Sequence, residues 1–243
     1  ELWLYSDFSP KLWMEMLDEL FEILNQFKKY SGIVTVDDYD LIYKTKTEDR
    51  LSELANSNKS FKKILTSDVL LINGKKYHNW PVIKKEIKLK IHDLYHEQDN
   101  CLIHGDLCFS NIFCDFKNKN FKLIDPRGKW GSTMFGDLKY DVAKLRHSVV
   151  GGFDTITNGL CTASVSEGNH IAMKIFEPKN HQEVCKYLDE LIQNQWNLNE
   201  IKLIEGLLFI SMLPLHKDHF ERQLAFYSIG IQRLNEVLDK TSE

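Results

Sequence analysis

Three polar residues stand at intervals that suit phosphoryl-transfer chemistry. Asp106 and Asn111 are five positions apart, just after His104, and Asp125 ends a later apolar run. Transfer of a phosphoryl group needs an acceptor for the proton of the attacking hydroxyl, ligands for magnesium, and positive groups near the phosphates. A loop of the form H-x-D-x-x-x-x-N provides a base and an amide ligand, and magnesium prefers oxygen ligands. We therefore expect Asp106 to be the base, and Asn111 and Asp125 to bind the metal.

Short apolar runs around these residues predict the strands that position them. Residues 101–103, 111–114 and 121–124 each read as a short strand, and a polar segment between the last two predicts a turn. A hairpin of this length would bring Asn111 and Asp125 close together.

The plainer interpretation is that these residues are ordinary turn residues. A His-Gly-Asp triplet is common by chance, and an aspartate at the end of a strand usually caps a backbone N–H group. The spacing to Asn111, the hairpin and Asp125 together favour a site over isolated turns.

Here the residues carry a resemblance to a known family. The segments HGDLCFSNIFCD and FKLIDPRG resemble the aminoglycoside phosphotransferase and choline kinase superfamily, small-molecule relatives of protein kinases. The resemblance implies that Asp106 is the catalytic base, that His104 braces the loop, and that ATP is the phosphoryl donor. It also implies that Asn111 and Asp125 bind magnesium and so hold the nucleotide. In the segment GDLKYDVAKL, Asp141 would brace the catalytic loop by hydrogen bonds.

A narrower resemblance concerns the acceptor. Three segments are similar to phosphotransferase-like proteins of bacterial capsule and surface-polysaccharide loci: HGDLCFSNI, IDPRG and the later ISMLPLHKDHFERQLAFY. The resemblance covers most of residues 1–240 loosely and residues 101–146 strongly. It implies ATP- and magnesium-dependent transfer to a hydroxyl of a small metabolite, such as a sugar or an amino alcohol.

Several basic residues are candidates for substrate contacts. Arg127 and Lys129 follow the second acid and could touch a phosphate, and His216, Lys217 and Arg222 form a later polar cluster. The same residues could equally be solvated surface charges, and the sequence leaves both interpretations open.

The segment before His104 lacks the parts that grip nucleotide phosphates in a complete kinase. It has no GxGxxG loop, and about 100 residues there read mainly as helices. The PVIKK stretch at 81–85 is not the strand lysine, because apolar residues recur at helical steps after Pro81. Residues 1–5 look like the segment after the hinge between two lobes. We therefore expect residues 1–243 to be a C-terminal lobe alone, with the N-terminal lobe absent and the isolated chain inactive.

The remaining patterns predict an α+β fold that is mainly helical with small β ribbons. Ser9 and Pro10 open an amphipathic helix that Gly32 ends, and Asn73-Gly74 predicts a tight hairpin. Further helices are expected around 51–65, after Trp80, and over 138–149, 181–197, 199–213 and 221–238.

Composition excludes some classes of partner. The net charge of −4 provides no basic field for nucleic acid or an acidic membrane, and no apolar run is long enough to cross a bilayer. The five cysteines are odd in number and form no CxxC pair, which indicates reduced thiols in a cytoplasmic protein.

Two other functions use the same residues. A non-catalytic kinase-like domain would bind or scaffold without turnover, and nucleotide binding by the chain would discriminate it. A hydrolase would use the same acids and metal on water, and analysis of the products would separate it.

Overall fold

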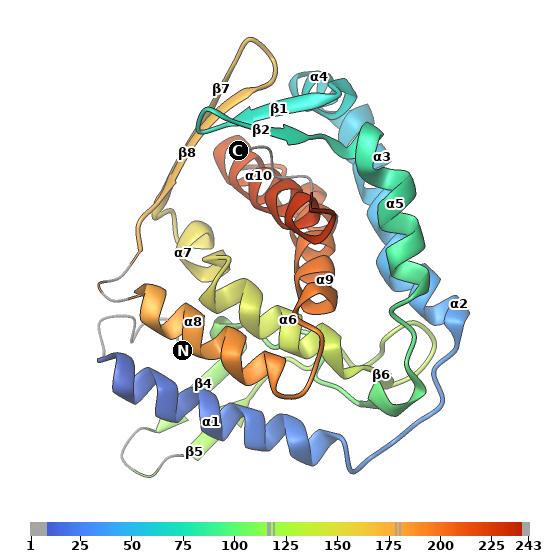
Figure 1. Ribbon diagram of the computed structural model, residues 1–243, viewed down its shortest axis with the longest axis vertical. Helices are drawn as coiled ribbons and strands as arrows, with labels where there is room; N and C mark the ends of the chain where they lie inside the picture. The colour runs from blue at the N-terminus through green and yellow to red at the C-terminus, as the bar shows by residue number, and fades with distance from the viewer. Residues whose placement is uncertain (1–8, 116–117, 119, 178, 180, 240–243) are drawn as a thin grey trace. The chain divides into compact units, whose positions relative to one another are not determined.

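The computed structural model describes residues 9–115, 118, 120–177, 179 and 181–239 (Figure 1). These residues form an α+β protein in which helical residues outnumber strand residues. The chain divides into two compact units. Unit 1 comprises residues 1–38, 96–155 and 177–201, and unit 2 comprises residues 39–95, 156–176 and 202–243. The kinase-like single lobe expected over residues 1–243 stays a prediction, and the predicted hinge-like segment 1–5 lies outside the described residues.

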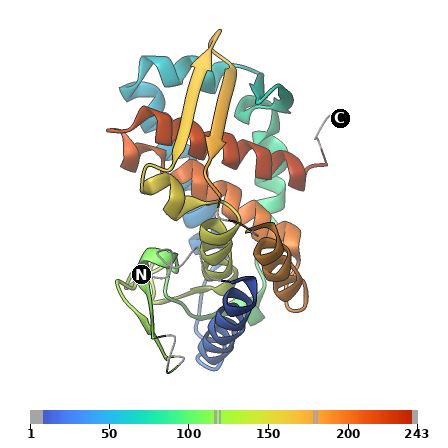
Figure 2. The same ribbon diagram turned by 90° about the vertical axis from the view of Figure 1, so that its left-hand side faces the viewer.

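Unit 1 combines helices with two pairs of short strands. Its elements are α1 Pro10–Phe27, η3 Glu97–Asp99, β3 Asn100–Leu102, η4 Phe109–Asn111, β4 Ile112–Asp115, β5 Asn120–Leu123, β6 Phe135–Asp137, α6 Leu138–Val149 and α8 His181–Gln193. β3 pairs antiparallel with β6, and β4 pairs antiparallel with β5, as the predicted hairpin requires. Helices α1 and α8 lie side by side (Figures 1 and 2).

Helix α1 begins as the sequence predicts but ends earlier. The Ser9 side chain accepts a hydrogen bond from the Leu12 N–H group at 3.4 Å, and Pro10 occupies the first helical position. The helix ends at Phe27, not at Gly32. The physical reason is a competing partner, because the Leu102 N–H group donates to the Tyr30 carbonyl at 2.8 Å and draws this segment beside β3.

Gly32 has a packing role instead of a helix-ending role. A Cβ atom at this position would overlap the ring of Phe135. The residue is therefore a glycine because β6 approaches the backbone closely.

Helix α6 is the central element of unit 1. All of its residues are buried, including its charged ones. Asp137 caps it, because its carboxylate accepts a hydrogen bond from the Lys139 N–H group at 3.0 Å. A buried helix with charged side chains needs specific polar partners, since an unpaired charge is costly to bury.

Unit 2 contains helices and one four-stranded sheet. Its elements are η2 Asp40–Thr45, α3 Lys46–Ser57, α4 Lys59–Thr66, β1 Val69–Ile72, β2 Lys75–His78, α5 Trp80–His92, β7 Cys161–Ser166, β8 His170–Ile175, η5 Leu213–His216 and α10 Phe220–Val237. Three helices cross the boundary between the units in sequence: α2 Val36–Tyr39, α7 Phe153–Thr157 and α9 Leu198–Ser211.

The predicted hairpin of unit 2 is present, and the helix after it is confirmed. Asn73 and Gly74 have φ values of 50° and 80° and join β1 to β2 in a tight turn. The PVIKK stretch lies in α5, which agrees with its interpretation as a helix instead of a strand.

The patterns read from the sequence leave residues 153–180 without an element, but this segment forms a hairpin. β7 and β8 pair antiparallel, with Glu167 and Gly168 at positive φ in the turn. β8 also pairs in parallel with β1, so the sheet order is β2-β1-β8-β7. Figure 2 shows α10 passing behind this hairpin, in contact with β7. The signal missed was the alternation of apolar and polar residues in Cys161–Ser166, followed by Gly168.

The later helices are close to their predicted bounds, with earlier ends. α8 stops at Gln193 and α9 at Ser211, and α10 runs from Phe220 to Val237. No helix in the described part of the chain is long and apolar enough to cross a membrane.

Candidate active site

The loop after β3 is fixed by the side chain of His104. The ring Nε2 lies 2.8 Å from the Ile124 carbonyl, which can only accept, so Nε2 carries the proton. The Asp106 N–H group donates to Nδ1 at 3.3 Å. Burial lowers the pKa of His104, and both contacts suit the neutral ring. His104 therefore ties the loop that carries Asp106 to the segment that ends at Asp125.

The side chain of Asp141, on α6, holds the backbone of the same loop. Its carboxylate accepts hydrogen bonds from the N–H groups of His104 at 2.6 Å and Gly105 at 2.8 Å. Burial raises the pKa of Asp141 to about 7, while these two N–H donors oppose the rise. The geometry is the one expected of a bracing residue.

Asp106 is held between two side chains and still reaches solvent. Lys144 Nζ lies 2.8 Å from Asp106 Oδ1, and Asn111 Nδ2 lies 3.3 Å from Asp106 Oδ2. The Asp106 side chain is 43% exposed, whereas that of Lys144 is 9% exposed. Burial opposes ionisation of Asp106, but the charge and hydrogen bond of Lys144 outweigh it and lower the pKa of this carboxyl group. Asp106 is thus an anionic, accessible acceptor in a fixed position.

The orientation of Asn111 is set by the same loop. Its Nδ2 also donates to the Asp106 carbonyl at 2.9 Å. The Ile124 N–H group donates to the Asn111 carbonyl at 3.0 Å, which joins the two segments at the base of the β4–β5 hairpin. Because the amide nitrogen is directed at Asp106, the side-chain oxygen is the atom that faces away from it and can bind a cation.

Asp125 has an unusual backbone conformation for a residue that is not glycine. Its φ is 53°, in the left-handed region, and the residue is exposed. Such conformations cost about 1 kcal/mol or more and often occur at functional sites. The chain after Ile124 therefore turns sharply, immediately beyond the hydrogen bonds that link Ile124 to His104 and Asn111.

Asn111 and Asp125 could offer two protein oxygens to a magnesium ion, and such a site would be open instead of closed. Magnesium commonly keeps several waters and takes only one or two protein oxygens beside substrate phosphates. In the described ranges, no group of three or more His, Cys, Asp and Glu side chains could hold a metal ion. Asn111 and Asp125 are the residues that would hold the ion, with phosphate oxygens and water as the other ligands.

Arg127 links the loop that contains Asp125 to the loop that contains Asp106. Its N–H group donates to the His104 carbonyl at 2.8 Å, and its guanidinium donates to the Tyr140 hydroxyl at 2.9 Å. Gly105 has a φ of 79°, and a Cβ atom there would lie 2.8 Å from the Arg127 Cβ. Glycine is therefore required both for the conformation and for the approach of Arg127. These contacts give Arg127 a local bracing role, while its predicted substrate contact stays a prediction.

Sequence reasoning missed three further residues that hold the loop. Lys144 contacts Asp106, the Ser148 hydroxyl accepts from the Phe109 N–H group at 3.1 Å, and Asp154 accepts from the Ser110 N–H group at 3.1 Å. Residues 141, 144 and 148 recur at helical steps on α6. A polar stripe at positions 141, 144 and 148, on a helix that also has apolar spacing, was the available signal.

A cavity lies beside the loop and has room for a small ligand. Its volume is about 210 Å³. It is lined by Leu102, Ile103, His104, Gly105, Pro126, Arg127, Gly128, Lys129 and Met134. The lining is mainly apolar, with two cationic residues, and it shares His104 and Gly105 with the candidate catalytic loop.

The later predicted substrate residues lie in unit 2, whereas the loop lies in unit 1. His216 Nδ1 is 3.3 Å from an Arg222 guanidinium nitrogen, and Arg222 also donates to the Thr157 carbonyl at 2.8 Å. Lys217 is exposed. His216 and Arg222 are thus brought together with each other, and their predicted substrate contacts stay predictions.

Comparison of the chain with protein-family models, with curated proteins and with solved structures gave no match.

Proposed function

We propose that this protein is a phosphotransferase that uses ATP and magnesium to phosphorylate a hydroxyl group of a small metabolite. The observation that supports it best is Asp106, a half-exposed carboxylate held between Lys144 and Asn111. A sugar or an amino alcohol of a surface polysaccharide is the proposed class of acceptor, because the segments HGDLCFSNI and IDPRG resemble proteins of surface-polysaccharide loci.

The chemistry assigned to each residue follows from its atoms. Asp106 accepts the proton of the acceptor hydroxyl as that oxygen forms a bond to the γ-phosphorus and the bond from phosphorus to ADP breaks. Magnesium, when bound, neutralises charge on the phosphate oxygens. Asn111 and Asp125 would hold the ion through oxygen atoms. His104 links the two loops, and Asp141 holds the first of them.

The test is phosphoryl transfer by the full-length protein. ATP, magnesium and a panel of sugars and amino alcohols are incubated with the protein, and ADP and the phosphorylated product are measured. We expect transfer to one class of acceptor and its loss when EDTA removes the metal.

Other outcomes would contradict the proposal in distinct ways. Release of inorganic phosphate without a phosphorylated acceptor would indicate a hydrolase. Nucleotide binding without turnover, measured by calorimetry, would indicate a non-catalytic binding domain.

A further inference from the structure

Helix α6 contains three buried lysine and arginine side chains, and two of them have an evident structural role. Lys139 Nζ lies 2.8 Å from Glu200, and Arg146 contacts Asp189 at 2.8 and 3.0 Å. Each pair joins α6 to another helix of the chain. These two pairs connect helices, and neither of them involves the loop at 104–111.

Lys144 differs because its partner is the candidate base. Its Nζ lies 2.8 Å from Asp106 Oδ1, and the aromatic ring of Phe153 lies 5.7 Å from the same Nζ. Burial of an ammonium group costs several kcal/mol unless it is compensated. Here the compensating carboxylate is on a loop and is 43% exposed, compared with 23% for Glu200 and 27% for Asp189 in the other two pairs.

The two oxygens of Asp106 are also in different environments. Oδ1 makes the short contact with Lys144, whereas Oδ2 is 3.3 Å from Asn111 Nδ2, at the long end of hydrogen-bond distances. The strong contact therefore fixes the carboxylate by one oxygen and leaves the other more weakly held.

We propose that Lys144 is a positioning residue that holds Oδ1 of Asp106, so that Oδ2 is presented to the hydroxyl of the acceptor. This inference rests on the proposed function. Reaction rates are sensitive to such placement, because a shift of about 1 Å in a reacting group can cost roughly 100-fold.

The experiment compares turnover of Mg·ATP by variants of the full-length protein, with the best acceptor of the sugar and amino-alcohol panel. Lys144→Met should lose roughly 100-fold in kcat, with KM for ATP and acceptor changed by less than about 3-fold. Lys144→Arg keeps the charge and should recover at least about 10-fold of that loss. Lys144→Gln repeats the test with a polar side chain, so the result does not depend on the folding of one variant.

Arg146→Met is the matched control, since it removes another buried cation of α6. It should lower the melting temperature and leave kcat within about 3-fold of wild type. In an Asp106→Asn background, Lys144→Met should cause no further loss of kcat, because the carboxylate that it positions is gone. If Lys144 had only a structural role, its effect on kcat would not depend on whether residue 106 is Asp or Asn.

Two results would overturn the inference while the wild type is active: an unchanged kcat in Lys144→Met, or a full additional loss in the Asp106→Asn background. Absence of transfer by the wild-type protein would instead overturn the proposed function itself, and the inference with it.

Discussion

Two sets of buried polar side chains, one in each compact unit, have different kinds of partner. In unit 2, the side chain of Asn79 donates to the carbonyls of Ile64 at 2.8 Å and Ser67 at 2.6 Å, and accepts from the Tyr227 hydroxyl at 2.6 Å. Asn235 likewise pairs with both backbone groups of His78, at 3.0 and 2.8 Å. These neutral amides are satisfied within the fold and connect its elements.

In unit 1, two buried ionisable side chains of α6 converge on one loop. Asp141 accepts from two loop N–H groups, and Lys144 contacts a carboxylate that solvent can reach. The satisfied amides stabilise the fold, whereas under the proposed function the buried Lys144 holds an accessible carboxylate in place. We therefore expect substitutions at the Asp106 loop of unit 1 to change activity, and substitutions at the buried amides of unit 2 to change stability.

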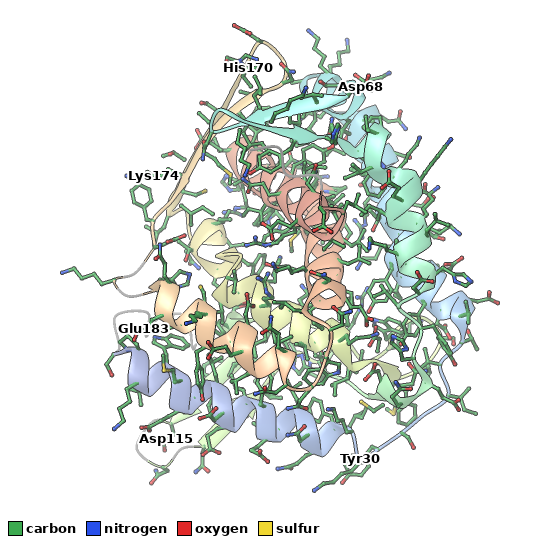
Figure 3. All side chains as sticks on the ribbon, viewed as in Figure 1. Tyr30, Asp68, Asp115, His170, Lys174 and Glu183 are labelled. Carbon is green, nitrogen blue, oxygen red and sulfur yellow. The ribbon has the colours of Figure 1, made fainter. Side chains whose placement is uncertain are left out.

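The largest effect should follow from neutralising the accessible carboxylate. Asp106→Asn removes the proton acceptor and should lower kcat by roughly 10²- to 10⁴-fold, as loss of a general base does. The assay is phosphoryl transfer in the full-length protein. Asp115, at the end of β4 (Figure 3), is exposed, and Asp115→Asn should leave kcat near that of wild type. Equal turnover of Asp106→Asn and wild type would remove the contrast between the units.

Removing a neutral buried amide should affect stability instead of activity. Asn79→Ala leaves two carbonyls and the Tyr227 hydroxyl without this partner, and should lower the free energy of unfolding by about 3 kcal/mol. Urea denaturation measures the change. The folded variant should keep its kcat, and a kcat reduced as far as in Asp106→Asn would contradict the division of roles.

The buried carboxyl of Asp141 should make stability depend on pH. Its pKa is raised to about 7, so the folded state holds a proton that the unfolded state has lost. Between pH of about 4 and about 7, the contribution of Asp141 to the free energy of unfolding should therefore fall as pH rises. Asp141→Asn should remove this contribution, so that its difference in unfolding free energy from wild type changes with pH in urea titrations, whereas that of Asn79→Ala should not. A difference that stays constant with pH in Asp141→Asn would show that this carboxyl is not the source.

The smallest effect should come from the basic cluster of unit 2. Arg222 donates to the Thr157 carbonyl at 2.8 Å, and Arg222→Met should lower the free energy of unfolding by about 1–2 kcal/mol. If Arg222 has only this structural role, KM for the acceptor stays unchanged. A KM raised about 10-fold or more would support the predicted substrate contact.

Local features of the sequence determined many of the elements. Ser9 with Pro10 marked the start of α1, Asn73-Gly74 marked the β1–β2 turn, and apolar spacing marked α6. These signals depend on the preferences of a few adjacent residues, so they can be read without knowledge of the fold. The spacing from Asp106 to Asn111 belongs to the same class, since one short loop brings both side chains together.

Only the tertiary structure decided which distant residues meet. α1 stops before Gly32 because β3 offers a partner about 70 positions further along the chain, and β8 pairs in parallel with a strand about 100 positions before it. The contact between Lys144 and Asp106 was equally hidden, because the polar stripe at 141, 144 and 148 marks one face of α6 but does not show that Asp106 lies against it. Such contacts depend on how elements pack, and sequence periodicity describes a face of an element without naming what covers it.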